Sequence, residues 1–319
     1  MPTADDGGLT AEDGARELAV LGSPIAHSKS PALHTAAYRA LGLPWTYGRA
    51  EVTPETLPEY VASRPDAWRG LSLTMPLKRS VLPLVSSLDE TAALTGAANT
   101  ILFETDASGR RRLSGFNTDV AGIVRAVSAA GTPRARSVLI WGGGATAASA
   151  VFAAARLGAQ SVTVQVRSPG RAEALVTLGH AVGLRVDIRR FGDDVVEPVD
   201  LVVSTLPGSA GVDGGARDIV RGEAIARAAA GGILLLDVAY DPWPTEVVRA
   251  WDLLGGTADR TTPRNVISGL AMLVQQALLQ VRIFVNGDPE RELREEPTVL
   301  AAMLDAVGLD ASGRPLAAL

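Results

Sequence analysis

The sequence contains no cysteine and only three histidines, His27, His34 and His180. Without a thiol the chain can form no disulfide, use no thiolate nucleophile and hold no cysteine-ligated metal. The histidines are too few and too scattered for a His-rich metal motif, so we expect no metal site.

Lysine is almost absent as well. Of the 30 basic residues 28 are arginine, and the two lysines are Lys29 and Lys78. Lys78 ends the stretch LTMPLK at residues 73–78. A lysine among so many arginines is either chance or a sign that this position needs an amine whose pKa can be shifted, which a guanidinium cannot offer.

Concentrated positive charge and long apolar runs are also missing. The net charge is -5 and the arginines are scattered, which predicts no nucleic-acid partner. No uninterrupted apolar run reaches the roughly 20 residues of a membrane span. Residues 1–16 are acidic and Gly-rich without the pattern of a signal peptide, so we interpret them as a disordered tail. We therefore expect a cytoplasmic protein without membrane contact.

The middle of the chain carries the clearest structural pattern. An apolar strand is predicted at 137–141, followed by the turn GGGATAA, an Ala-rich helix and a second strand at 161–167. This is the βαβ unit of a dinucleotide-binding fold. Apolar strands that alternate with helices predict a doubly wound parallel sheet. The further segments are strands at 184–188, 200–208 and 232–240 and one helix at 216–231.

A second α/β region flanks this one. It has predicted strands at 17–22, 45–52 and 70–74, a Pro-started helix at 31–42 and a long buried helix at 267–285. We therefore predict two α/β domains. The first comprises 17–118 and is completed by the C-terminal helices of 263–319, and the second is a Rossmann domain at 119–262.

The glycine turn predicts a nucleotide site. Gly142 permits a tight turn, Gly144 lets the backbone approach a pyrophosphate at the helix N-terminus, and Ala148 is small enough for close helix–sheet packing. The second strand ends in Arg167, Ser168 and, shortly after, Arg171, where an NAD site would have an acidic residue. This favours NADP, whose 2′-phosphate the arginines would receive. The alternatives are a ligand-free turn and two surface arginines.

Other polar residues cluster in the first region. Ser28 and Ser30 precede a helix and are either caps or donors to a small carboxylate. Lys78 and Asp119 are either a proton-transfer dyad or a surface lysine and a helix-capping aspartate. Sequence alone leaves both pairs open. Ser72, Thr74, Asn99 and Asn117 also lie at the ends of predicted strands.

Together these motifs resemble the shikimate dehydrogenase family, from about residue 18 to 286. The resemblance rests on GSPIAHSKSPALH, LSLTMPLK, GAANT, GFNTD, the GGGA turn and MLVQQA in this order. It implies an N-terminal substrate domain, a Rossmann NADP domain and the NADPH-dependent reduction of 3-dehydroshikimate to shikimate. It also implies residue roles: Lys78 and Asp119 catalytic; Ser28, Ser30, Ser72, Thr74, Asn99, Tyr240 and Gln276 at the substrate; Gly142, Gly143, Gly144, Ala145, Arg167, Ser168 and Arg171 at the cofactor.

The sequence departs from the family pattern at several of these sites. Ser72 and Leu73 replace the usual Asn-Val, Thr35 replaces an Asn, Val166 replaces an Asn before the clamp arginine, and Ala271 replaces a Gly. These changes leave two alternatives on the same scaffold, a quinate- or aminoshikimate-type dehydrogenase and a catalytically silent sensor of NADP or a shikimate-like ligand. In each case we expect a monomer or homodimer with small-molecule ligands.

Overall fold

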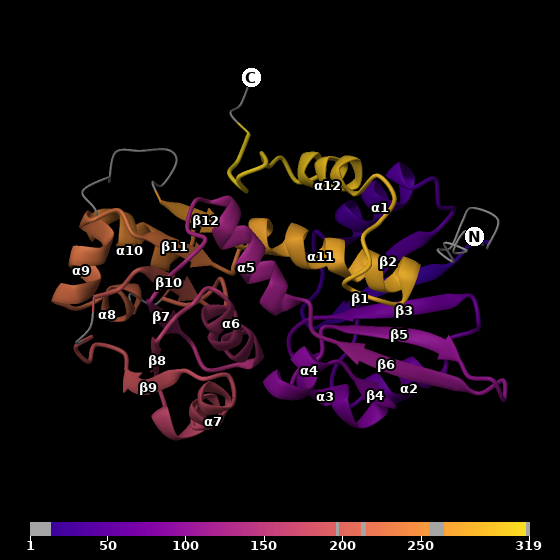
Figure 1. Ribbon diagram of the computed structural model, residues 1–319, viewed down its shortest axis with the longest axis horizontal. Helices are drawn as coiled ribbons and strands as arrows, with labels where there is room; N and C mark the ends of the chain where they lie inside the picture. The colour runs from indigo at the N-terminus through magenta and orange to yellow at the C-terminus, as the bar shows by residue number, and fades with distance from the viewer. Residues whose placement is uncertain (1–13, 196–197, 212–214, 255–264, 317–319) are drawn as a thin grey trace, which may run out of the picture. The chain divides into compact units, whose positions relative to one another are not determined.

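The computed structural model describes residues 14–195, 198–211, 215–254 and 265–316 (Figure 1). The chain divides into two compact units, residues 1–118 with 274–308 and residues 119–273 with 309–319. The first division lies after Thr118.

A mixed six-stranded sheet forms the centre of the first unit. Its strand order is β2-β1-β3-β5-β6-β4, with β1 parallel to β2 and β3, β5 antiparallel to β3 and β6, and β4 parallel to β6. The strands are β1 (Glu17–Gly22), β2 (Thr46–Glu51), β3 (Trp68–Leu73), β4 (Ser87–Leu88), β5 (Thr100–Thr105) and β6 (Arg111–Phe116).

The two faces of this sheet bury different kinds of side chain. Successive residues of a strand point to opposite faces, so Leu71 and Leu73 of β3 enter one apolar core while Gly70 and Ser72 face the other way. Helices α2 and α3 cover the apolar face through residues such as Leu57 and Leu77. The helices of this unit are α1 (Ser30–Ala40), α2 (Leu57–Ala62), α3 (Leu77–Ser80), α4 (Glu90–Thr95) and α12 (Glu296–Asp305), with a 3-10 turn at Leu82–Leu84.

Helix α11 (Gly269–Asn286) packs on the second face. A Cβ at Gly70 would lie 2.6 Å from the Phe284 ring, so only glycine lets the helix approach β3 this closely. By length and mean hydropathy, 1.2, α11 could cross a membrane, but 78% of it is buried inside the protein, as in a core helix. Its glutamines interrupt the apolar run, which is why the sequence showed no span-length segment.

The second unit is built on a fully parallel sheet of order β12-β11-β10-β7-β8-β9. Read in chain order this is the doubly wound arrangement of a dinucleotide-binding fold, with its reversal of direction between β7 and β10. The strands are β7 (Ser137–Trp141), β8 (Ser161–Val166), β9 (Arg185–Arg190), β10 (Leu201–Ser204), β11 (Leu234–Asp237) and β12 (Val266–Ser268).

Helices flank this parallel sheet. Leu139, Trp141 and Leu235 enter a core that is closed by Val248 and Trp251 of α10 (Glu246–Leu254). Elsewhere α5 (Asp119–Ala129) packs on α6 (Ala145–Arg156), which also contacts β7 (Figure 1). The remaining helices are α7 (Ala174–Ala181), α8 (Ala216–Ile219) and α9 (Glu223–Ala230), with a 3-10 turn at Pro169–Arg171.

The structure differs from the sequence-based expectations at three places. The single helix expected at 216–231 is two helices, because Gly222 adopts a φ of 115° between α8 and α9. The chain returns to the first unit at Val274 rather than at 263, because Val266–Ser268 pairs with β11, and residues 309–319 belong to the second unit.

The third difference concerns the expected tail at 1–16. Residues 1–13 lie outside the described residues, whereas Arg16 is held in place, since its carbonyl accepts a hydrogen bond from Thr46 N at 2.9 Å.

Candidate active site

The glycine turn after β7 has the geometry that close backbone approach requires. Gly142 has a φ of 108°, and a Cβ added there would overlap Thr205 Oγ1, which donates to Trp141 O at 2.8 Å. Only glycine satisfies both conditions. Gly144 then caps the N-terminus of α6, whose Ala145 begins the helix and whose first N–H groups suit an anion. The turn lies at the switch point of the sheet, where dinucleotides bind in this fold.

The two arginines predicted to select NADP lie beside this turn. Gly142 N donates to Gln165 O at 3.0 Å, and Gly143 approaches Val166, the last residue of β8. Arg167, Ser168 and Arg171 follow directly and are all exposed to solvent. Exposed guanidinium groups next to a pyrophosphate turn fit a dinucleotide that carries an additional phosphate.

The two serines of the first motif are buried at the start of α1. Ser28 Oγ accepts a hydrogen bond from the backbone N–H of Ser30, the first residue of α1, at 3.3 Å. This contact accounts for one lone pair of Ser28. Lys29, which lies between them, is exposed.

The LTMPLK stretch forms a turn that is pinned to the carboxyl end of β1. Thr74 N donates to Leu21 O at 2.9 Å, and a Cβ at Gly22 would overlap the Thr74 methyl group. The turn leads into the short helix α3, where Lys78 is half-buried and its carbonyl accepts from Ala98 N at 2.8 Å. The backbone around Lys78 is therefore fixed by β1 on one side and by the GAANT segment on the other.

Asn99 connects this segment to the end of the first unit. Its Nδ2 donates to Thr118 Oγ1 at 2.8 Å and to Gln276 Oε1 at 3.1 Å, and its Oδ1 accepts from Thr118 N at 3.0 Å. Thr118 is thus anchored, and the next residue along the chain is Asp119, the buried first residue of α5. Lys78 belongs to the first unit and Asp119 to the second.

Comparison with known proteins agrees with this geometry. The family model of the shikimate dehydrogenase substrate binding domain matches residues 20–101. The NADP(+)-dependent shikimate dehydrogenase of Methanothermobacter thermautotrophicus is 31% identical over 281 residues, covering 87% of this chain and 93% of that protein. The chain belongs to the shikimate dehydrogenase family.

Solved structures of the shikimate dehydrogenase family have the same fold. The Mycobacterium tuberculosis shikimate dehydrogenase is 36% identical with a TM-score of 0.72, over 91% of this chain and 99% of that one. The Thermus thermophilus enzyme, crystallised with NADP(H) and shikimate, is 29% identical with a TM-score of 0.67, over 91% and 99% of the two chains.

Ser72 stands where the shikimate dehydrogenase family usually has an asparagine, and its hydroxyl is engaged inside the first unit. It accepts from Tyr47 OH at 2.7 Å and donates to Gln280 Oε1 at 2.9 Å. A hydroxyl has one proton, so Ser72 has no second hydrogen to offer a ligand.

Several polar residues around this site were not predicted. His34, Tyr47, Thr100, Thr118 and Gln280 are all buried and hydrogen-bonded on the second face of the sheet. Burial lowers the pKa of His34 from 6.5 to about 3, against a smaller opposing effect of its hydrogen bond to Gln280. One signal was available: Gln276 and Gln280 are four residues apart in a largely apolar helix, hence on one face.

Tyr240 lies in the second unit, in the loop after β11, and is half-buried. Near the start of this loop Asp237 accepts from Thr245 Oγ1 at 2.6 Å, and Thr245 in turn caps α10 by accepting from Val248 N. Burial raises the pKa of Asp237 to about 6, partly offset by the hydrogen bonds that Thr245 Oγ1 and Ala239 N donate to it. The loop that carries Tyr240 is thus tied to α10.

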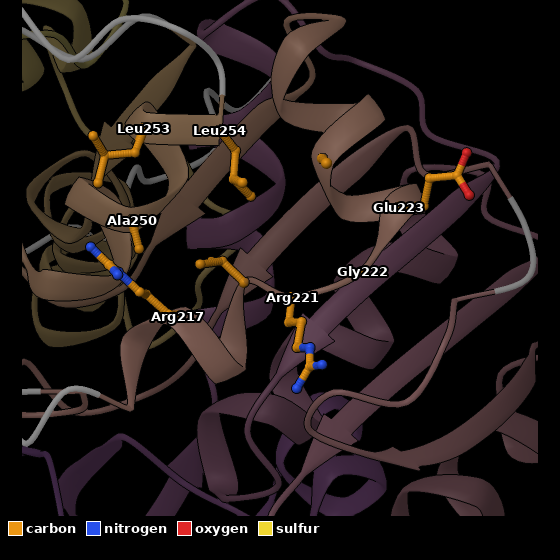
Figure 2. Close-up of a pocket in the computed structure, with 9 residues that line it drawn as sticks. Arg217, Arg221, Gly222, Glu223, Ala250, Leu253 and Leu254 are labelled. Atoms are coloured by element: carbon orange, nitrogen blue, oxygen red, sulfur yellow. The ribbon is translucent and has the colours of Figure 1, made fainter.

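A pocket of about 620 Å³ lies elsewhere on the second unit (Figure 2). Arg217 and Arg221 come from α8 and the turn after it, and Leu253 and Leu254 from the end of α10. None of the nine residues that line it belongs to the predicted site. Leu254 is the last described residue before the gap at 255–264.

Proposed function

We propose that this member of the shikimate dehydrogenase family catalyses the NADP(H)-dependent interconversion of 3-dehydroshikimate and shikimate. It acts on small molecules in the cytoplasm, as a monomer or homodimer. The observation that carries the proposal is the presence of Lys78, Asp119, Asn99 and Gln276, which the family resemblance places at the reaction, on a chain 31% identical to an NADP(+)-dependent shikimate dehydrogenase.

The second unit holds the cofactor. The pyrophosphate is bound at the start of α6 by Gly142, Gly143, Gly144 and Ala145. The 2′-phosphate is bound by Arg167, Ser168 and Arg171. When bound, the reduced cofactor supplies the hydride that adds to the carbonyl carbon of the substrate.

The first unit supplies most of the substrate contacts. The hydroxyls of Ser28 and Ser30 bind the carboxylate at the start of α1. Thr74, Asn99 and Gln276 surround the ring hydroxyls, and Tyr240 of the second unit completes the set. These groups are neutral and their backbones are fixed, so they orient the substrate at little entropic cost.

Lys78 transfers the proton. As the carbonyl oxygen becomes an alkoxide, the Lys78 ammonium stabilises the developing charge and donates the proton that forms the hydroxyl. Asp119 orients the amine and binds a ring hydroxyl. In the oxidative direction the neutral amine removes the same proton. Arginine could not replace Lys78, because its guanidinium does not give up a proton near neutral pH.

A substrate screen tests the proposal. Purified protein is mixed with shikimate, quinate or aminoshikimate and with NADP⁺ or NAD⁺, and the absorbance of the reduced nicotinamide is followed. We expect turnover with shikimate and NADP⁺ to exceed all other combinations. Faster turnover of quinate with NAD⁺ would assign the related dehydrogenase activity instead, and tight NADP⁺ binding without any turnover would assign a sensor.

A further inference from the structure

We propose that Gln280 is a positioning residue that sets the direction of the hydrogen bonds in the substrate site through Thr100 and Asn99. The inference rests on the proposed function, in which Gln276 binds a ring hydroxyl and Asn99 holds Gln276 in place. It concerns residues one helical turn behind that site, on the buried face of β3 and β5.

All four hydrogen-bonding positions of the Gln280 amide are occupied by named partners. Its Nε2 donates to Asn99 O at 3.2 Å and to Thr100 Oγ1 at 2.9 Å. Its Oε1 accepts from Ser72 Oγ at 2.9 Å and is 3.2 Å from His34 Nε2. The residue is 2% exposed, so water does not substitute for these partners.

A backbone carbonyl decides which way this amide points. Asn99 O can only accept, so the group of Gln280 that faces it must be the NH₂. The Oε1 therefore faces Ser72 and His34. Since Oε1 can only accept, His34 carries its proton on Nε2, and its Nδ1 accepts from Tyr38 OH at 3.2 Å. The His34 ring, stacked on Tyr47 at 3.9 Å, is neutral in this arrangement.

The same reasoning extends to Asn99. Thr100 Oγ1 accepts from Gln280, so its own proton is directed to Asn99 Oδ1 at 2.9 Å. The backbone N–H of Thr118 also donates to Asn99 Oδ1. The oxygen of Asn99 is thus held by the backbone N–H of Thr118 and, through Gln280, by Thr100, with Thr118 Oγ1 as a further neighbour at 3.3 Å.

The last step reaches the substrate contact. With its oxygen fixed, Asn99 presents Nδ2 to Gln276, whose Oε1 accepts from it and from Thr118 Oγ1 at 3.2 Å. Gln276 therefore turns its amide nitrogen away from Asn99, so that the group it directs to a ring hydroxyl is a donor. The direction of every bond in this series follows from two backbone groups, Asn99 O and Thr118 N.

Ser72 acquires a different role from that implied by the family resemblance. Its proton is used toward Gln280 and it links Tyr47 to the series. Ser72 is thus a further positioning residue, and it holds Gln280 rather than the substrate.

Two substitutions at Gln280 test the inference. Gln280→Leu removes all four bonds, and Gln280→Glu keeps the shape but loses the donors to Asn99 and Thr100 when ionised. We expect each to raise KM for shikimate about tenfold or more, as for loss of a well-placed hydrogen bond. KM for NADP⁺ should stay within about twofold, because the glycine turn lies in the second unit.

Gln275→Leu is the matched control, an identical change on the same helix at a residue outside this series of bonds. We expect its KM values to stay within about twofold of the wild type. Thr100→Val breaks the adjoining link, and combined with Gln280→Leu it should cost no more than the worse single change, since both act on one series. A shikimate KM unchanged in Gln280→Leu, or equal losses for both substrates, would overturn the inference.

Calorimetric titration with shikimate separates this inference from the proposed function. If the wild type binds shikimate without turnover, the proposed activity is wrong and the positioning role is still measured by the Kd of Gln280→Leu. If the variant then binds as tightly as the wild type, the positioning role is wrong. If the wild type neither binds nor converts shikimate, both proposals fail.

Discussion

One buried sheet face of the first unit is more polar than the core of the second unit. In the first unit, the face toward α11 carries Ser72 and Thr100, joined to Gln280 and to the neutral ring of His34. In the second unit, the core around Leu139, Trp141, Val202 and Leu235 is mainly apolar, although Trp141 Nε1 donates to Oε1 of the buried Gln165 at 3.0 Å. The difference follows from what each unit has to recognise.

The first unit binds a ligand whose hydroxyls differ only in their positions, so the direction of each donor matters. A fully bonded polar network fixes those directions because reversing one amide would leave several buried groups unsatisfied. In the proposed function the second unit binds phosphates mainly through backbone N–H groups, whose direction is set by the turn at Gly142. The core of the second unit therefore needs no such polar network.

The largest test of this comparison removes the one charged group proposed to react. Lys78→Ala should lower kcat about 10²- to 10⁴-fold, the usual contribution of a positioned acid, with little change in KM for NADPH. Steady-state kinetics with varied NADPH measures both. Lys29→Ala is the control, since it removes the other lysine, which is exposed, and should leave kcat within about twofold. A kcat of Lys78→Ala within about threefold of the wild type would contradict the proton-transfer role of Lys78.

The free energy of unfolding should depend on pH in opposite directions through the two buried groups His34 and Asp237. His34 has a folded pKa of about 3 against 6.5, so the unfolded chain binds more protons and stability falls as pH drops from 6.5 toward 3. Asp237 has a folded pKa of about 6 against 3.8, so its contribution is present below 3.8 and is lost as pH rises to 6. Over its window the contribution amounts to about 5 kcal/mol for His34 and about 3 kcal/mol for Asp237.

Neutral replacements of His34 and Asp237 should change the pH dependence of the unfolding free energy in opposite directions. Urea unfolding between about pH 4 and pH 7 should show a flatter loss of stability for His34→Gln and a steeper one for Asp237→Asn, since each change removes one of the two opposing titrations. Parallel curves for both variants and the wild type would show that neither group titrates differently on folding.

A glycine substitution tests recognition by backbone. Gly142→Ala must adopt a φ of 108° and place its Cβ against Thr205 Oγ1, so we expect a loss of about 2 kcal/mol in unfolding free energy and weaker NADP⁺ binding. Gly144→Ala has a φ of -87° and open space around the added Cβ, so its unfolding free energy should change by less than about 0.5 kcal/mol. Equal losses of stability would contradict the steric explanation.

The smallest expected effect concerns cofactor choice. Arg167→Ala should raise KM for NADPH about tenfold and leave KM for NADH nearly unchanged, because only NADPH carries the 2′-phosphate. Arg39→Ala, at the exposed end of α1, provides the control. Equal changes for the two cofactors would show that Arg167 contacts some other part of the nucleotide.

Much of the fold followed from local pattern. The strands β1 and β7 and the βαβ unit around the glycine turn were predicted because apolar period, glycine and helix propensity agree there. The helix expected at 216–231 was wrong, since an Ala-rich pattern conceals the break at Gly222, and the start of α11 was extended into β12. Strand pairing, which assigned Val266–Ser268 to the second sheet, is not a local property.

The sequence by itself determined the motifs: one of only two lysines in an arginine-rich chain, two arginines where an acid would select NAD, and the glycine turn after an apolar strand. Only the tertiary structure decided that Ser72 donates its hydrogen bond to Gln280 and that His34 is buried and neutral. The physical reason is that hydrogen-bond direction depends on partners far apart in the sequence. Asn99 O and Thr118 N fix it here, and they act only once α11 lies against the sheet.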